Sequence, residues 1–161
     1  MFEVTEKSIV TPQYVGFYLG RALYGFDKNR LAGVLDWQMP KPLLKGPRYV
    51  RGVVYVEDQP VLVIDLRERF NIDYDANNLT TNSVLLINHC VSVQGVHYPM
   101  LGLVVDGLAN HVPADNSKIK TSGYVSDDFI SEIIRINNQA MLLLNLDRFL
   151  KQGLLHLHQC C

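Results

Sequence analysis

The stretch GVVYVEDQPVLVIDLRERF, residues 52–70, decides how the rest of the chain is interpreted. Two runs of β-branched residues flank an acidic break at Asp58-Gln59, a pattern that predicts two strands joined by a tight turn. The second run ends at Asp65, and the LRERF segment after it has the composition of a single helical turn. An aspartate at a strand end beside two arginines fits either an active site or the structural end of a hairpin.

The same hairpin pattern occurs again eighty positions later. Residues 132–146, EIIRINNQAMLLLNL, repeat the apolar positions of residues 52–66. Asp65 has Asn145 at its equivalent place, and both side chains can accept a hydrogen bond from the first turn of a helix. We therefore expect Asp65 to cap the short helix after the first hairpin, and Asn145 or Asp147 to cap a C-terminal helix.

A second pair of segments matches at a shift of seventy-seven positions. This shift places Gly25 over Gly102 and Leu31 over Leu108. Two pairs of segments in the same order at almost the same offset indicate a duplication into two related units of sixty to seventy residues. Catalysis becomes the less favoured role for Asp65, because the second unit has an amide in its place.

The chain divides into a polar arm (residues 1–13), one domain of two duplicated units (14–151) and a helix end or tail (152–161). Eight to ten short apolar segments with little helix predict closed or sandwiched antiparallel sheets. Barrels remove exposed strand edges, which suits strands that carry few edge-protecting lysines.

Three segments of this domain are less clear. Residues 28–37 fit a short helix or a strand, and residues 91–99 read as a turn region. Residues 147–158 have apolar side chains at helical spacing, which predicts a C-terminal helix.

Charge and composition limit the partners. The 15 Lys and Arg and 16 Asp and Glu residues give a net charge of −1 and are scattered along the chain, so no basic field for nucleic acid or anionic lipid is expected. No apolar run approaches the eighteen or so residues of a membrane-spanning helix, and no signal sequence opens the chain. Three cysteines do not make a disulfide framework. We expect a cytoplasmic protein without direct membrane insertion.

The sequence marks no catalytic or nucleotide-binding motif. Residues 73–84 begin like a calcium loop, but Asn78 stands where Gly is needed and Val84 where a bidentate Glu belongs. His89, His97 and His111 are isolated near apolar strands, which is typical of structural histidines.

The tail carries four soft donors, His156, His158, Cys160 and Cys161. They belong to one terminal segment, whereas structural zinc sites normally take ligands from two separated pairs. We therefore predict no metal, no cofactor and no enzymatic activity.

Five short motifs in a fixed order resemble the CheW-like domain, the adaptor family that couples histidine kinases to chemoreceptors. They are YGFD at residues 24–27, YVRGV at 49–53, VLVIDLR at 61–67, GLVVDG at 102–107 and LLLNL at 142–146. The resemblance covers nearly the whole chain, and its specificity comes from the order and spacing of the motifs. It implies a mainly β fold of two intertwined five-stranded SH3-like β-barrels with short helices and a C-terminal helix.

The resemblance also implies an adaptor without catalysis of its own. One surface would bind the regulatory domain of a CheA-like histidine kinase, and a groove between the barrels would bind the helical hairpin tip of a methyl-accepting chemoreceptor. Carried over position by position, the groove side includes Leu31, Gly52, Val84, Gly102 and Leu108. Each of these positions is equally compatible with barrel core or, for the glycines, with a turn.

The chain departs from the family at the tip of its first hairpin. Where the family usually has Asn-Leu-Arg-Gly, this chain has Tyr55-Val56-Glu57-Asp58, and Gly33 stands where the family often has a glutamate. Glu57 thus reverses the charge of an arginine. Reversed charge in an interface repels a partner built for the original sign, so we expect Glu57 and Asp58 to set partner preference. Two alternatives follow: an adaptor of a type IV pilus (twitching) array, or a β-barrel binding module unrelated to chemoreceptors.

Overall fold

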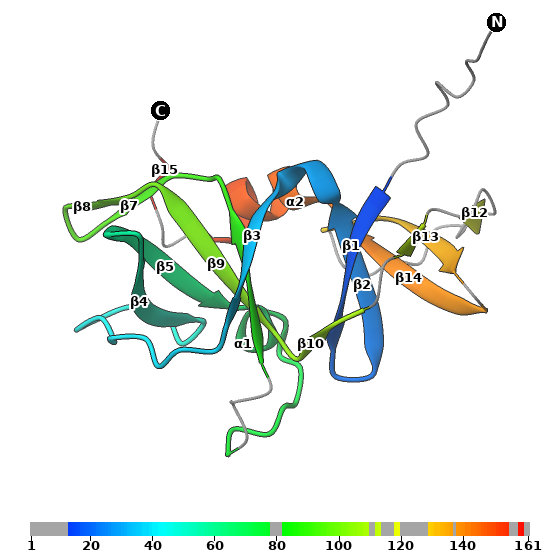
Figure 1. Cartoon of the computed structure of the whole chain (residues 1–161), viewed down its shortest axis with the longest axis horizontal. Helices are drawn as coiled ribbons and strands as arrows, with labels where there is room; N and C mark the ends of the chain where they lie inside the picture. Colours follow the sequence, from blue (N-terminus) through cyan, green and yellow to red (C-terminus); the bar gives the residue numbers. More distant parts are fainter. Residues whose placement is uncertain are drawn as a thin grey trace, which may run out of the picture.

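The computed structural model describes residues 13–77, 82–109, 112–113, 118–119, 129–136, 138–154 and 158–159. Within these ranges the chain is mainly β, and short helical segments accompany the strands (Figure 1). The elements of the first half are β1 (Gln13–Leu19), β2 (Ala22–Asp27), the 3₁₀ turn η2 (Lys28–Arg30), β3 (Leu31–Asp36), β4 (Val50–Val56), β5 (Gln59–Asp65) and α1 (Leu66–Phe70). Those of the second half are β6 (Ser83–Ile87), β7 (Val91–Val93), β8 (Val96–Tyr98), β9 (Met100–Val105), β10 (Gly107–Leu108), β11 (Val112–Pro113), β12 (Lys118–Ile119), β13 (Ile130–Ile136), β14 (Gln139–Leu144), α2 (Leu146–Arg148), the π-helical turn η4 (Phe149–Gly153) and β15 (His158–Gln159).

Two principal sheets lie side by side, with the C-terminal helical segment beside the junction between them (Figure 1). The first sheet has five strands in the order β3-β6-β9-β5-β4. The second has the five central strands β10-β1-β2-β14-β13, extended by the two-residue strands β11 and β12. A small third sheet has the order β15-β7-β8. The expected pair of five-stranded β units is confirmed.

The two sheets are intertwined because each takes strands from both halves of the chain. Strands β3 and β5 of the first sheet pair with β6 and β9 from the second half, respectively, while β1 and β2 complete the sheet that contains β13 and β14. A parallel contact closes each exchange, with Val63 on β5 opposite Gly102 on β9, and Leu143 on β14 opposite Gly25 on β2. These two pairs are related by the same shifts of eighty and seventy-seven that relate the sequence segments.

The two hairpins share structural details that follow from their similar sequences. The register of β4 against β5 shifts between Val50 and Gly52, and that of β13 against β14 shifts between Ile130 and Glu132, eighty positions later. Each pair of strands therefore carries an irregularity at the same place, which increases the local twist of the strand.

Both expected helix caps are confirmed. The Asp65 carboxylate accepts a hydrogen bond from the Arg67 backbone N–H at 3.0 Å and caps α1. The Asn145 side chain accepts one from the Arg148 backbone N–H at 3.1 Å and caps α2. Each cap satisfies a backbone donor that the first turn of a helix otherwise leaves without a partner.

Three apolar clusters hold these elements together. The largest takes residues from both sheets and from the C-terminal helical segment, including Phe17, Ile64, Leu103 and Phe149, all 0% exposed. Each sheet also has a smaller core on its other face. In the first sheet it consists of Val54, Val61, Val63, Val84, Leu86 and Val104. In the second it consists of Leu23, Ile134, Ile136, Met141 and Leu143.

Two turns differ from the expectations. The first hairpin turns at Glu57 and Asp58, one residue earlier than predicted, with φ values of 50° and 66°. Residues 91–99 are not a simple turn region, because β7 and β8 form a hairpin around Gln94 and Gly95. Gly95 supplies a positive φ at no steric cost, which allows a two-residue turn between two very short strands.

The ambiguous segments are also settled. Residues 28–36 form the 3₁₀ turn η2 and then strand β3, not a helix. The C-terminal helix is shorter than the spacing predicted and ends at Gly153, whose carbonyl accepts a hydrogen bond from the Arg69 side chain. A glycine at this point favours helix termination. None of the helices in the described ranges is long and apolar enough to cross a membrane.

Candidate interaction surfaces

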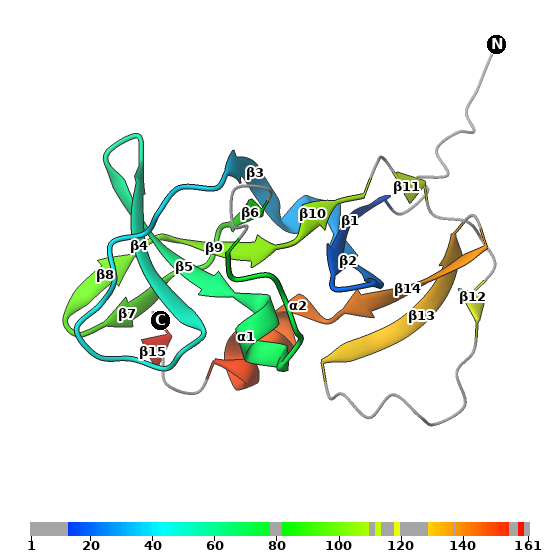
Figure 2. The same ribbon diagram turned by 90° about the horizontal axis from the view of Figure 1, so that it is seen from below.

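The tip of the first hairpin projects from the first sheet (Figure 2). Glu57 and Asp58 are exposed there, and Tyr55 beside them leaves 65% of its surface exposed. Because both tip residues adopt the left-handed backbone region, the strands are joined by the tight two-residue turn that suits their twist. The side chains at which the chain departs from the family pattern are therefore held outward on a short, defined turn.

Two of the five expected groove positions lie inside the core of the first sheet. Val84 is 3% exposed, and Gly102 packs against it so closely that an added Cβ at Gly102 would lie 2.7 Å from Val84 Cγ1. Gly52 is also buried, but against the chain segment at Lys41, whose carbonyl oxygen would lie 2.1 Å from an added Cβ. These three positions contribute backbone or core packing.

The other two groove positions lie on edge strands. Leu31 begins β3, the edge of the first sheet, and packs half-buried against the central core. Leu108 ends β10, at the edge of the second sheet, and is 41% exposed. On β3, Val34 is 45% exposed. Leu31, Val34 and Leu108 thus come from one edge strand of each sheet, while Val84 and Gly102 pack against each other within the first sheet.

A buried ion pair follows the first hairpin directly. Arg67, 1% exposed, donates from Nε to Asp65 Oδ1 at 2.9 Å and from Nη2 to Asp65 Oδ2 at 3.0 Å. This two-pronged geometry fixes both side chains more strongly than a single contact would. Arg51 donates from Nε to Asp65 Oδ2 at 2.9 Å and approaches from the partly exposed side.

The Arg67 side chain also connects the first sheet to the second. Arg67 Nη1 donates to Asp106 Oδ1 at 2.7 Å, and Asp106 Oδ2 accepts a hydrogen bond from the Gly20 backbone N–H at 2.5 Å in the turn between β1 and β2. We call the side chains of Arg51, Asp65, Arg67 and Asp106 the polar joint. It links the end of β5, the end of β9 and the β1–β2 turn of the second sheet.

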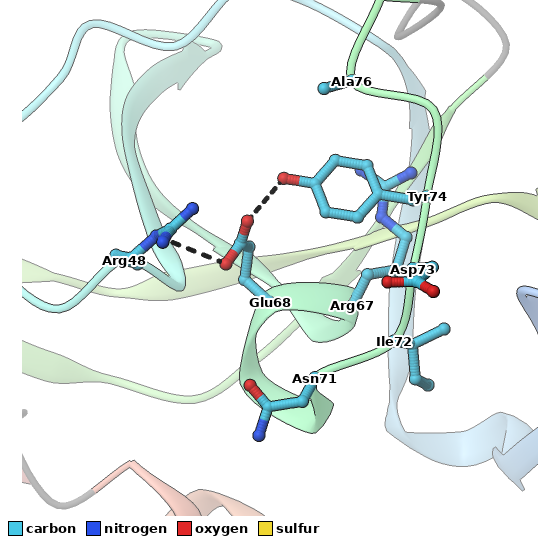
Figure 3. A pocket seen from close by; sticks show the side chains of 8 residues that line it. All are labelled: Arg48, Arg67, Glu68, Asn71, Ile72, Asp73, Tyr74 and Ala76. Carbon is cyan, nitrogen blue, oxygen red and sulfur yellow. Dashed lines mark hydrogen bonds and ion pairs between the residues drawn. The ribbon is translucent and has the colours of Figure 1, made fainter.

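The Tyr74 ring lies over the Arg67 side chain of the polar joint (Figure 3). The Arg67 guanidinium carbon lies 4.1 Å from the centre of the Tyr74 ring, and the Tyr74 hydroxyl donates to Glu68 Oε1 at 2.6 Å. Arg51 also donates to the Tyr74 hydroxyl. A shallow pocket of about 390 Å³ lies here, lined by Arg48, Arg67, Glu68, Asn71, Ile72, Asp73, Tyr74 and Ala76. Three of its charged residues, Arg48, Arg67 and Glu68, already pair with neighbouring side chains, which favours a structural role for them.

The Asp65 carboxyl group is not arranged for acid–base catalysis. Burial alone would raise the pKa of Asp65, but hydrogen bonds and charges from Arg67 and Arg51 outweigh burial and hold that pKa below its ordinary value. A carboxylate locked in its ionised form by two arginines is a poor proton donor or acceptor near neutral pH.

Metal-ligand clusters were absent from the described ranges. Of the four soft donors in the tail, only His158 falls within these ranges, and the other three lie outside them. Likewise His89 and His97 are placed, on the β6–β7 connection and on β8, whereas His111 is not described.

Sequence reasoning found Asp65 but missed the ion pair between Arg67 and Asp106. The motifs VLVIDLR and GLVVDG contain Arg67 and Asp106, yet nothing local connects residues that are 39 positions apart. An acidic residue that directly follows a buried strand, as Asp106 follows β9, is a signal that a buried or half-buried cation lies nearby. Tyr74, in a polar loop, carried no such signal.

Comparisons with known proteins agree with this architecture. A model of the CheW-like domain matches residues 13–153. A chemotaxis protein CheW from Treponema pallidum (strain Nichols) is 20% identical over 143 residues, which are 84% of this chain and 80% of that protein. The crystal structure of the scaffolding protein TtCheW from Thermoanaerobacter tengcongensis aligns with a TM-score of 0.69 at 21% identity and covers 84% of this chain and 89% of that one. CheW-like scaffolding proteins are non-catalytic, which confirms that the chain is not an enzyme.

Proposed function

Because this chain belongs to the CheW-like domain family, we propose that it acts as an adaptor in the cytoplasm that couples a CheA-like histidine kinase to chemoreceptors. The observation that carries the proposal is the family match over residues 13–153, together with two intertwined sheets whose edge strands present apolar side chains. An adaptor must offer two separate protein-binding surfaces on a rigid body. Here the polar joint and the exchanged strands supply the rigidity.

For the receptor, we propose that the groove is bordered by Leu31 and Val34 on β3 and by Leu108 on β10. These side chains are apolar and partly exposed, which suits the amphipathic helix of a receptor hairpin tip. Val84, Gly102 and Gly52 would act indirectly, because they set the position of the strands that carry the contact residues.

For the partner choice, we propose that Glu57 and Asp58 at the hairpin tip discriminate between kinases or receptors. They are exposed, and they place negative charge where the family usually has an arginine. This departure also supports the alternative of an adaptor in a type IV pilus (twitching) array, since a chain that serves a different array needs a different charge pattern.

The direct test is binding of the purified chain to the regulatory domain of the CheA-like kinase from the same organism, measured by calorimetry. We expect a complex with one adaptor per regulatory domain. A second titration uses the cytoplasmic hairpin of a receptor. If the kinase domain does not bind although a known adaptor does, the kinase half of the proposal fails. Binding to a kinase encoded with pilus genes, and not to a chemotaxis kinase, would favour the alternative.

Glu57→Arg tests the role of the tip, with Asp73→Arg as the control because Asp73 is also exposed and gives the same change in charge. We expect Glu57→Arg to leave the melting temperature unchanged and to alter kinase or receptor affinity about tenfold or more, since a reversed charge in an interface acts on recognition rather than on folding. Asp73→Arg should change neither. A shift in melting temperature without a change in any binding constant would remove the tip from the recognition surface.

A further inference from the structure

A single residue carries the chain from the first sheet to the second. Strand β9 ends at Val105 in the first sheet, Asp106 follows, and β10 begins at Gly107 in the second sheet. Leu108, one of the proposed groove residues, is the second residue of β10 and lies opposite Phe17 on β1. The place of this groove edge relative to the first sheet therefore depends on how Asp106 is held.

Asp106 is fastened on both sides of the crossing. Its backbone N–H donates to the Tyr18 carbonyl at 3.0 Å, and its Oδ2 accepts from the Gly20 backbone N–H at 2.5 Å, so it is tied to β1 and to the β1–β2 turn. Its Oδ1 accepts from Arg67 Nη1 at 2.7 Å, and Arg67, 1% exposed, lies in α1 directly after β5 of the first sheet. The carboxylate thus uses one oxygen for each sheet.

The other crossing beside the groove is tied by a more exposed contact. Here the chain passes from β2 in the second sheet to β3 in the first through η2, directly before Leu31. The ion pair at this crossing joins Arg30 to Asp147 of α2, with side chains that are 31% and 66% exposed. Ion pairs between exposed side chains hold geometry weakly, because water and salt compete with them.

The restraint at Asp106 differs in kind from the apolar core that the sheets share. The largest core cluster buries side chains of both sheets, but the gain from burying apolar surface is non-directional. Hydrogen bonds to a carboxylate are short and depend on distance and angle. Asp106 therefore adds a directional restraint at the point where the two sheets are joined.

We propose that Asp106 is a positioning residue for the receptor groove. It fixes the place of Leu108 on β10 relative to Leu31 and Val34 on β3 without itself contacting the receptor. A helix held between two edges needs both edges at the right spacing, and loose support of a binding site weakens it. The effect on receptor affinity rests on the proposed function, whereas the placement of the sheets does not.

The first experiment measures the placement of the sheets by double electron–electron resonance between pairs of spin labels. One pair spans the sheets, at Asp36→Cys on β3 and Arg135→Cys on β13, and the other lies within the first sheet, at Asp36→Cys and Gln59→Cys. All three positions are exposed and lie outside the proposed groove contacts. The background has the melting temperature of the natural chain and carries serine at Cys90, Cys160 and Cys161.

Asp106→Asn is compared with Asp75→Asn, the same change at an exposed aspartate that accepts from the Asn77 backbone N–H. An amide has one acceptor oxygen and cannot serve the Gly20 and Arg67 donors as a carboxylate does. We expect Asp106→Asn to broaden the distances across the sheets and to leave those within the first sheet unchanged. Asp75→Asn should change neither. Distances that stay the same, or that broaden alike in both pairs, would overturn the proposal.

Asp106→Glu gives the answer if Asp106→Asn does not fold. It keeps the charge opposite Arg67 and lengthens the side chain by one methylene, so the mean distance across the sheets should shift. An unshifted mean would refute the positioning role.

The second experiment titrates the unlabelled variants with the cytoplasmic hairpin of a receptor from the same organism. We expect Asp106→Asn to weaken binding about fivefold or more, as substitutions that touch no ligand can do through the elements they hold, and Asp75→Asn to have no effect. Natural affinity despite broadened distances would contradict the link to the groove. If the natural chain does not bind the receptor, the receptor part of the proposed function fails, and the distances alone decide whether Asp106 positions the sheets.

Discussion

Arg67→Met should destabilise the protein far more than a surface substitution, because it leaves the Asp65 carboxylate buried without its main partner. Asp65 is 0% exposed, and the Arg67 side chain makes four hydrogen bonds: two to Asp65, one to Asp106 and one to Asn82. Removing one partner of a buried pair typically costs about 3–5 kcal/mol. Since Arg51 still contacts Asp65, we expect a loss of about 3 kcal/mol at pH 7, at the lower end of that range.

The pH dependence of this loss distinguishes electrostatics from packing. In the natural chain the pKa of Asp65 is lowered, so its stabilising contribution is complete above the ordinary value of 3.8 and is lost as the pH falls through the lowered folded-state pKa. In Arg67→Met, burial dominates and raises the pKa of Asp65. Protonation then relieves the buried charge as the pH falls from 7 toward that raised pKa. The difference in stability between the two proteins should therefore shrink on acidification.

Urea unfolding followed by fluorescence of Trp37, the single tryptophan, gives both stabilities at each pH. Arg48→Met is the matched control, since that arginine is 89% exposed and lies 3.7 Å from Glu68, and it should change stability by less than about 0.5 kcal/mol. A loss below about 1 kcal/mol for Arg67→Met, or a loss that does not change between pH 7 and mildly acidic pH, would refute the electrostatic account of the polar joint.

Two further substitutions test the backbone. Gly52→Ala should lower the free energy of unfolding by about 3 kcal/mol or more in thermal unfolding, because both its φ of 134° and the Lys41 carbonyl oxygen, 2.1 Å from the new Cβ, oppose a side chain. The control Gly46→Ala should be almost neutral, since nothing lies within 4 Å of its new Cβ. The combined change of Glu57→Asn and Asp58→Gly should raise stability by about 1 kcal/mol, since Asn and Gly tolerate the left-handed turn better. An unchanged or lower melting temperature would contradict this explanation of the turn.

Local features of this fold could be predicted because neighbouring residues determine them. The two hairpins, the Asp65 and Asn145 caps and the helical turn after each hairpin depend on alternation, turn residues and capping side chains within a few positions. The hairpin at residues 91–98 was missed although Gln94 and Gly95 give a turn signal, because its strands have only three residues each and resemble a loop. The C-terminal helix was overextended because the apolar spacing continues past Gly153.

The functional surfaces were harder to predict because sequence similarity does not separate contact residues from residues that position them. Gly102 and Leu108 lie in the same motif region, yet an added Cβ at Gly102 would meet Val84 in the core while Leu108 is 41% exposed. The polar joint depends on Arg67 meeting Asp106 across 39 positions, which only the exchange of strands between the sheets brings about. The burial of each groove residue and the long-range pairing of Arg67 with Asp106 could therefore be read only from the structure.

The exchange of strands also separates the residues that packing holds in place from the exposed residues of the hairpin tip. Neither sheet is complete without strands from the other half, and Asp106 and the Gly20 turn tie the two sheets at the polar joint. Motif residues such as Gly25, Gly102 and Arg67 are therefore constrained by packing on both halves at once. Glu57 and Asp58 are exposed on a two-residue turn and contribute nothing to either core. A change of charge at the tip therefore leaves the joint unaffected, which is what the proposed role of the tip in partner choice requires.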